Sequence, residues 1–206
     1  MAKKKIVTGK RLSPEKRITN ILDVAANIIT QHGMSAATIE RIAADADISK
    51  GLVYNYFPDR IDLLASLLER EYAVTSEKII DAAESTDDFE HMVRLTNRIY
   101  LKHMRDKGAL LQRLFNEPSV VEIVNERRKP LKQITTRYLM KLVAEKYGLP
   151  ANLSKFGIDL SAGLTSAAAN YVFTESDVDF QLAEDICVDM TMAVVKSLAS
   201  KHNQIN

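Results

Sequence analysis

Residues 38–60 constrain the fold of this chain most strongly, because they hold two short helical patterns joined by a turn. Apolar residues of the first pattern recur at helical spacing: Ile39, Ile42, Ala43 and Ala46. Thr38 is a good N-cap for that helix, and Ser49 is a second N-cap candidate. Asp47 lies at the turn, where its short side chain tolerates a left-handed backbone at some strain. The stretch therefore predicts a helix-turn-helix.

The second helix of the pair divides into an inner and an outer face. Apolar side chains that should pack inward are Leu52, Val53 and Phe57. Lys50 and Tyr54, four residues apart, share the other face and offer a charge and a hydroxyl to phosphate oxygens. Gly51 allows backbone to approach closely, and Asn55 can hydrogen-bond base edges or phosphate. Such a helix fits the major groove of DNA. The alternative is a helical hairpin in a core, with Tyr54 and Tyr56 half buried.

The segment before this stretch supplies a supporting helix and a basic arm. Ser13-Pro14-Glu15 is a helix start, and Gly33 stops the helix. Its apolar stripe should form the floor on which the helix-turn-helix packs. Basic residues precede it: Lys3, Lys4, Lys5, Lys10 and Arg11. This arm would follow phosphates or enter the minor groove, or it is a solvated terminus without a specific partner. It lacks the apolar run of a signal peptide or a membrane helix.

From Arg17 to Leu64 the chain closely resembles the DNA-binding domain of the TetR family of bacterial transcriptional regulators. The residues that carry the resemblance are Ile21, Ala25, Gly33, Ala37, Thr38, Ile42, Ala43, Ala46, Ser49, Lys50, Gly51, Tyr54, Tyr56, Phe57, Leu63 and Leu64. The family usually has glycine at Asp47 and lysine at Arg60, so a slightly strained turn is expected and the positive charge is kept. The resemblance implies an all-helical homodimer that binds a palindromic operator and is usually released by a small ligand.

The resemblance also implies which residues touch DNA. Phosphate contacts would be Thr38, Lys50, Tyr54 and Arg60, and the face around Lys50, Gly51 and Asn55 would lie nearest the bases. The complete set of candidate DNA-binding residues is Thr38, Ser49, Lys50, Gly51, Tyr54, Asn55, Tyr56 and Arg60.

Charge is distributed unevenly along the chain, although 28 Lys and Arg against 27 Asp and Glu leave a net charge of only +1. Residues 1–60 carry ten basic and six acidic side chains, and residues 61–206 carry eighteen and twenty-one, so the two parts have net charges of +4 and −3. The positive field lies at the presumed DNA end. We therefore expect a DNA-binding helix-turn-helix domain with its basic arm at 1–60, and a helical ligand-binding and dimerisation domain at 61–206.

The second part has a helical apolar period with few glycines and prolines. The expected helices span residues 60–83, 86–105, 108–115, 119–146, 153–173 and 180–202. The predicted fold class is all-α. It comprises an N-terminal three-helix domain that contains the helix-turn-helix and a larger C-terminal helical bundle.

The last two expected helices are apolar on more than one side, and such helices need two packing partners. One partner is the rest of the domain. The other is a second subunit, as the resemblance also implies. The candidate dimer-interface residues are Ala162, Gly163, Ala167, Ala168, Met190 and Val194. The alternative is that both helices are central in a single subunit.

A ligand pocket is expected in the second domain, where apolar side chains are mixed with occasional hydroxyls. Its candidate residues are Met92, Thr96, Tyr100, Met104, Phe115, Tyr138 and Tyr171. The alternative for each is a plain core position, since aromatic and methionine residues at helical spacing are usually core. Helix capping explains the acidic cluster Asp87, Asp88, Glu90 and His91 more simply than metal binding does, so no metal site is expected.

No enzyme is expected, because the sequence has no P-loop, dinucleotide turn, nucleophile elbow or zinc-binding His-Glu helix. No catalytic residue and no cofactor are assigned. The single Cys187 lies in an apolar run, excludes internal disulfides and fits a reducing cytoplasm, away from any membrane. We expect a transcriptional repressor released from its operator by a small-molecule effector. The alternative is a DNA-bound recruitment or structural factor controlled by a protein partner.

Overall fold

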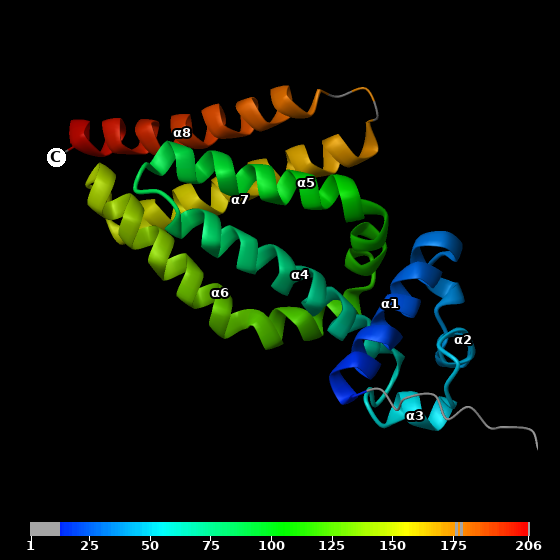
Figure 1. The fold of residues 1–206 in the computed structure, drawn as a ribbon. Coiled ribbons are helices and arrows are strands. Elements are labelled where there is room, and N and C mark those ends of the chain that lie inside the picture. Colours follow the sequence, from blue (N-terminus) through cyan, green and yellow to red (C-terminus); the bar gives the residue numbers. More distant parts are fainter. Residues whose placement is uncertain (1–12, 176, 178, 206) are drawn as a thin grey trace, which may run out of the picture. The chain divides into compact units, whose positions relative to one another are not determined.

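The computed structural model describes residues 13–175, 177 and 179–205, and within them every regular element is a helix. The elements are α1 (Pro14–His32), the short 3₁₀ helix η1 (Met34–Ala36), α2 (Ile39–Asp45), α3 (Lys50–Tyr54), α4 (Arg60–Glu84), α5 (Phe89–Phe115), α6 (Pro118–Tyr147), α7 (Ala151–Thr174) and α8 (Phe180–Ile205) (Figure 1). The predicted all-α class is confirmed. The predicted basic arm at 3–11 lies outside the described residues.

Two compact units divide the chain, Met1–Leu67 and Leu68–Asn206. Helix α4 begins in the first unit and continues into the second. The functional boundary expected after residue 60 stays a prediction, because compactness does not test which residues bind DNA or a ligand.

The first unit is built from helices that begin and end at the expected capping residues. The Ser13 hydroxyl accepts a hydrogen bond from the Lys16 amide at 3.4 Å, Pro14 is the first residue of α1, and Gly33 follows its end with φ 88°. Helix α1 packs on η1 and α2, and α2 packs on α3. The core of this unit includes Ile21, Ala25, Ile29, Ile42, Val53, Phe57, Leu63 and Leu64. Helix α1 therefore forms the expected floor.

The second unit is a bundle in which α5 packs against α7 and α8, and α6 packs against α7. Figure 1 shows α5, α7 and α8 running alongside one another. One apolar core joins these helices: Phe89, Met92, Val93, Val143, Leu149, Val188, Met192 and Val195. Gly148 ends α6 with a left-handed φ of 66°, and Pro150 directly precedes α7, so the predicted break at this point is confirmed.

One predicted boundary is wrong, namely the helix end expected between residues 105 and 108. Helix α5 continues without interruption from Phe89 to Phe115. Gly108 serves packing rather than a turn, because a Cβ atom there would lie 2.2 Å from Cδ2 of Phe173 on α7. Helix α6 likewise continues through Pro130, which has no N–H to donate, and Figure 1 shows this helix changing direction in its first half.

Candidate functional site

The turn between α2 and α3 is held by two side-chain caps. The Thr38 hydroxyl accepts a hydrogen bond from the Arg41 amide at 3.2 Å, and the Ser49 hydroxyl accepts one from the Leu52 amide at 3.2 Å. Asp47 is the non-glycine residue with a positive φ, 52°, among the residues that the structure describes. Both caps and the strained position are therefore confirmed where the sequence predicts them. Together they fix the direction in which α3 leaves the turn.

Helix α3 has an apolar side that packs inward and a polar side that is exposed. Of the three side chains expected inside, Val53 and Phe57 are buried and Leu52 is half-buried. The exposed candidates are Thr38, Ser49, Lys50, Gly51, Tyr54 and Asn55, and Tyr56 is half-buried. A Cβ atom at Gly51 would meet no atom of the described residues within 4 Å, so glycine leaves open space outside the helix. The candidates on α3 therefore form one accessible surface.

Lys50, Tyr54 and Glu40 form a small cluster on this surface. The Lys50 ammonium donates to the Glu40 carboxylate and lies 5.7 Å from the centre of the Tyr54 ring. The hydrogen bond from Lys50 lowers the pKa of Glu40, and the same contact raises the pKa of Lys50. Both groups therefore stay charged at neutral pH. Glu40 was missed from the sequence, because ten residues and a turn separate it from Lys50.

Arg60 is engaged within the first unit. Its Nε donates to the Ala37 carbonyl at 2.8 Å, and its Nη2 donates to the Met34 carbonyl at 2.7 Å. These two bonds tie the start of α4 to η1, and they need the forked guanidinium, which a lysine would not supply. The role of Arg60 as a phosphate contact stays a prediction.

The outer faces of α7 and α8 carry apolar stripes. On α7 the exposed positions at helical spacing are Phe156, Leu160, Gly163, Ala167 and Tyr171; on α8 they are Leu182, Ile186, Met190 and Ala193. The two helices pack against each other. We call these nine residues the outer stripes. They include Gly163, Ala167 and Met190 of the predicted dimer interface. Ala168 and Val194 are half-buried, and the exposed Ala162 lines a cavity instead.

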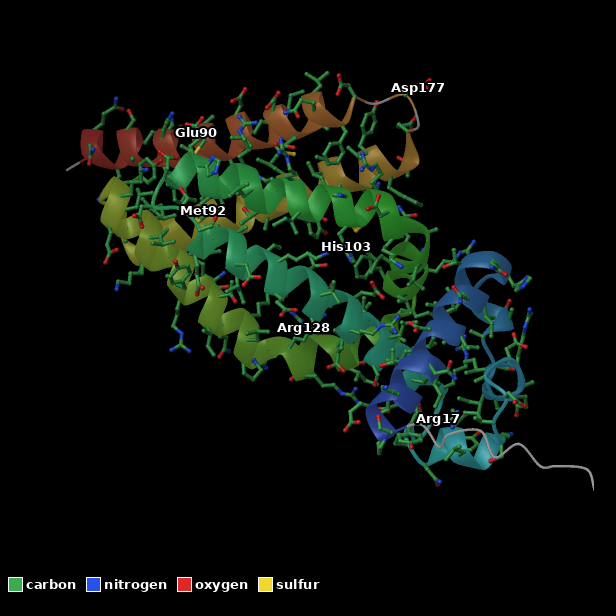
Figure 2. All side chains as sticks on the ribbon, in the orientation of Figure 1. Arg17, Glu90, Met92, His103, Arg128 and Asp177 are labelled. Carbon is green, nitrogen blue, oxygen red and sulfur yellow. The ribbon has the colours of Figure 1, made fainter. Side chains whose placement is uncertain are left out.

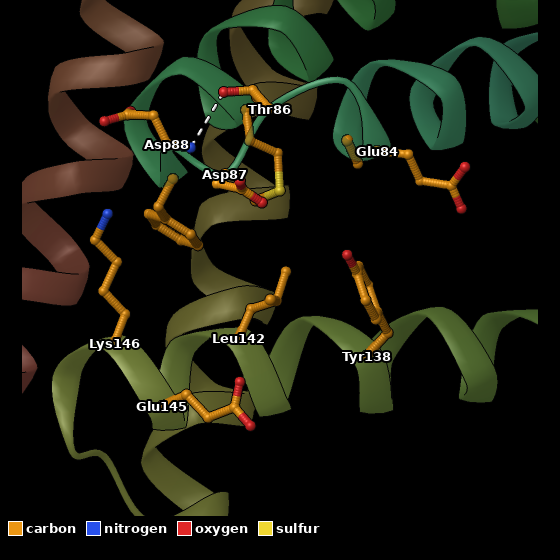
Figure 3. A pocket seen from close by; sticks show the side chains of 11 residues that line it. Glu84, Thr86, Asp87, Asp88, Tyr138, Leu142, Glu145 and Lys146 are labelled. Carbon is orange, nitrogen blue, oxygen red and sulfur yellow. Dashed lines mark hydrogen bonds between the residues drawn. The ribbon is translucent and has the colours of Figure 1, made fainter.

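Two cavities lie among the helices of the second unit. The inner cleft, of about 190 Å³, is lined from α5, α6, α7 and α8 and includes the predicted ligand residues Met92 and Thr96. The outer pocket, of about 470 Å³, lies where the loop before α5 meets α6, and Met92 and Tyr138 line it. Figure 3 shows Tyr138 and Leu142 of α6 pointing across this pocket toward the loop. Three of the seven predicted ligand residues thus meet at these cavities.

The other predicted ligand residues lie elsewhere in the second unit. Phe115 lies 6.2 Å from the ring of Tyr72, and Arg128, labelled on α6 in Figure 2, lies 4.8 Å over that ring. Burial raises the pKa of Tyr72, and the nearby Tyr100 raises it further. Met104 is a buried core residue. Tyr171, 57% exposed, belongs to the outer stripes. Their assignment to a ligand site stays a prediction.

An ion-pair network around the buried Glu184 joins α5 to α8 and was missed from the sequence. Glu184 is completely buried, and its Oε2 accepts from Arg98 Nε at 2.7 Å. Arg94 pairs with the neighbouring Asp185, whose pKa this hydrogen bond lowers. When an arginine and an acidic residue lie on different helices, no pattern in the sequence predicts that they form an ion pair. The network neutralises both arginines within the bundle.

The capping role expected of the acidic cluster is confirmed for Asp88. Asp88 is the N-cap of α5 and accepts a hydrogen bond from the His91 amide at 2.8 Å, so capping accounts for this member of the acidic cluster. That bond also lowers the pKa of Asp88. Cys187 is buried, and burial raises the pKa of its thiol, as suits an unreactive core position.

Comparison with known proteins places the helix-turn-helix in a family. The sequence model "Bacterial regulatory proteins, tetR family" matches residues 21–67. The HTH-type transcriptional repressor SCO4008 of Streptomyces coelicolor is 36% identical over 81 residues, which are 37% of this chain and 38% of the repressor. The HTH-type transcriptional activator FasR of Mycolicibacterium smegmatis is 21% identical over 185 residues, 89% of this chain and 83% of the activator.

The fold as a whole also has relatives among solved structures. A putative transcriptional regulator from Pseudomonas aeruginosa PAO1 matches with a TM-score of 0.77 over 94% of this chain and 95% of that one, at 14% identity. At such identity the likeness concerns the fold alone. The chain spans less than half the length of the repressor SCO4008 that it matches. Within the described residues, no helix is long and apolar enough to cross a membrane.

Proposed function

The chain belongs to the TetR family of transcriptional regulators, and from that premise we propose that it is a homodimeric repressor of a palindromic operator, released by a small-molecule effector. Residues 1–60 would bind DNA, and residues 61–206 would bind the effector and the second subunit. The observation that carries the proposal is the exposed polar face of α3, set on an apolar core by two capped helices.

The contacts of α3 support its role as the DNA-reading helix. Lys50 and Tyr54 stand together on the exposed face, where a cation and a hydroxyl suit phosphate oxygens. Ser49, Gly51 and Asn55 are exposed as well, and the face around Lys50, Gly51 and Asn55 would be nearest the bases. On binding, Lys50 would exchange the Glu40 carboxylate for a phosphate, so the residue that now orients Lys50 would also compete with DNA for it.

The outer stripes support the homodimer. Adjacent helices with exposed apolar side chains gain free energy when a second copy covers them, since each buried methylene contributes about 0.8 kcal/mol. Such an interface would be self-complementary under a twofold axis. Two α3 helices related by that axis would enter successive major grooves, about 34–36 Å apart, and would therefore require a palindrome.

The cavities of the second unit support a small-molecule effector. Such a molecule releases DNA only if it binds more tightly to the form that does not fit the operator. A mostly apolar cleft with a few polar groups is typical of ligand sites. We propose repression because the relative named as a repressor, SCO4008, is 36% identical over its 81 matched residues, whereas the relative named as an activator, FasR, is 21% identical over 185.

Control by a protein partner is the second candidate, and one surface favours it. Leu131, Ile134 and Tyr138 are exposed on one side of α6 at helical spacing. A partner that covers them would regulate the chain without entering the inner cleft.

The test of DNA reading is a salt-series titration of Lys50→Ala against duplex DNA flanking the gene of this protein. The variant should bind more weakly, and the slope of log affinity against log salt should fall by about one for each lost phosphate contact, two per dimer. Tyr54→Phe should weaken binding with the dimer intact. Lys196→Ala, at an exposed lysine on α8 outside the proposed DNA-binding part, is the control. Unchanged affinity in both Lys50→Ala and Tyr54→Phe at physiological salt would refute α3 as the reading helix.

A further inference from the structure

Two hydroxyl groups in the second unit are buried without the partner that a helix normally offers. They belong to Ser161 on α7 and Thr191 on α8, and neither oxygen has a hydrogen-bond partner in the described part of the chain. Thr191 is only 7% exposed. A serine or threonine inside a helix usually donates to a nearby carbonyl of the preceding turn, as Thr165 does to the Ser161 carbonyl at 3.1 Å. Ser161 and Thr191 do not follow this pattern.

Both hydroxyls line the inner cleft, whose other walls are mostly apolar. Among the other lining residues, Met92, Val143 and Val195 offer no hydrogen bond. The hydroxyls of Thr96 and Thr165 already donate to the Met92 carbonyl and to Asn97 Oδ1. A buried hydroxyl without a partner lowers stability, so two of them in one cavity need an explanation. A bound molecule that supplies the missing partner provides it. The cleft has a volume of about 190 Å³, well above the roughly 10–15 Å³ that one water needs by the same measure, so it has room for a molecule built on a single ring.

The charge of the walls restricts which molecule fits. None of the described residues that line the inner cleft is charged. Hydroxyls can satisfy a neutral polar group, but an ion in such a site would lose its hydration without a counter-charge. The outer pocket shares Phe89 and Met92 with the cleft, and its charged lining residues are the acids Glu84, Asp87, Asp88 and Glu145 and the single cation Lys146, so negative charge predominates (Figure 3). This negative charge would repel an anion that approaches from that side.

We propose that the inner cleft binds a small uncharged molecule, mainly apolar, whose single hydroxyl or carbonyl group hydrogen-bonds to Ser161 and Thr191. The two hydroxyls come from adjacent helices, so a molecule bound to both connects α7 with α8. The inference rests on the proposed function in one respect, namely that this molecule is the effector that releases DNA. Its binding can be measured without DNA.

The probes that test the ligand class are phenol, toluene and benzoate, which share one aromatic ring and differ in hydroxyl and charge. Isothermal titration calorimetry of the full chain measures the binding of each. Phenol is expected to bind about tenfold more tightly than toluene, which corresponds to one gained hydrogen bond, and benzoate is expected not to bind. Equal affinities for phenol and toluene, no binding of phenol, or tighter binding of benzoate would overturn the proposal.

Ser161→Ala combined with Thr191→Val removes both hydroxyls with little change in shape. This variant should lose the preference for phenol over toluene, and without any probe its Tm should rise by a few degrees, because two unpaired buried hydroxyls are gone. Ser166→Ala and Ser197→Ala, at exposed positions on the same helices, are matched controls that should change neither quantity. A lower Tm together with a retained preference for phenol would show that the hydroxyls serve the fold, and would overturn the proposal.

Failure of this inference differs from failure of the proposed function. If phenol binds as expected but leaves the affinity for DNA unchanged, the ligand class stands and the role of the cleft in releasing DNA is wrong. If the chain does not bind DNA under any condition, the proposed function is wrong, and the calorimetric result keeps its meaning.

Discussion

The two units of this chain differ in which polar and apolar groups they bury and which they expose. In the first, the caps of α1, α2 and α3 are satisfied, the apolar side chains are buried, and the outward face of α3 is polar. In the second, apolar stripes on α7 and α8 are exposed. The buried side-chain oxygens without a hydrogen-bond partner in the described residues also lie there, on Ser161, Glu184 and Thr191, although Glu184 is ion-paired with Arg94 and Arg98.

This difference indicates what each unit lacks. A polar surface over a complete core is stable in water in the absence of its partner. A charged partner such as DNA can then bind to it without burial of apolar side chains. Exposed stripes and unpaired buried hydroxyls are costs that a folded chain retains only when something else offsets them. A second copy would cover the stripes, and a ligand would satisfy the hydroxyls.

The largest expected effect comes from placing charge in the outer stripes. Ala167→Glu combined with Ile186→Glu should give monomers in analytical ultracentrifugation, because like charges would face each other across a twofold axis. Operator affinity should fall about 100-fold or more, since the second half-site no longer binds as part of the same molecule.

Ser166→Glu is the control for this substitution, because it adds a charge on α7 beside the outer stripe rather than in it. It should leave a dimer. A doubly substituted chain that still sediments as a dimer would show that the interface lies elsewhere, and the contrast between the two units would lose its explanation.

A smaller effect is expected inside the bundle, at the contact between α5 and α7. Gly108→Ala would place a Cβ atom 2.2 Å from Phe173 and should lower the free energy of unfolding by about 1–3 kcal/mol. Urea denaturation followed by circular dichroism measures this change. Phe173→Leu in the same chain should restore part of the lost stability by making room. A Gly108→Ala variant as stable as the parent would mean that the two helices move apart freely.

The smallest effect expected is the pH dependence that comes from His103. Burial lowers the pKa of this histidine, Lys78 and Lys107 add to that shift, and Glu71 opposes it. Below pH about 6.5, the unfolded chain therefore binds a proton that the folded chain still excludes, so stability falls as the pH decreases from there. His103→Gln should flatten this part of the stability profile. An unchanged profile in the variant would exclude His103 as its source.

Local signals predict the first unit well and the second unit only in outline. The caps at Ser13, Thr38 and Ser49 and the inward Val53 depend on neighbours within a few residues, so the sequence alone locates them. Glycine often marks the end of a helix, and the sequence predicts such an end near Gly108. Its role is instead decided by packing against Phe173, which is 65 residues away in the sequence. Propensity is a weak guide where distant packing decides.

The candidate sites divide in the same way. Lys50 and Tyr54 stand together as their spacing predicts, whereas Glu40 reaches Lys50 only through the turn between two helices. Tyr171, a candidate pocket residue, lies on an exposed side of α7, so its role as a ligand contact stays a prediction. Which side of a long helix faces a cavity depends on the crossing of helices, and apolar periodicity on two sides of one helix does not distinguish them.

The most direct test of the account is hydroxyl-radical footprinting of the intact protein, at physiological salt, on the DNA that flanks its own gene. The account predicts two protected half-sites related by a twofold axis, with centres about 34–36 Å, or a multiple of that distance, apart along the helix. A single protected segment, or protection that disappears at moderate salt, would contradict a dimer that reads a palindrome through α3.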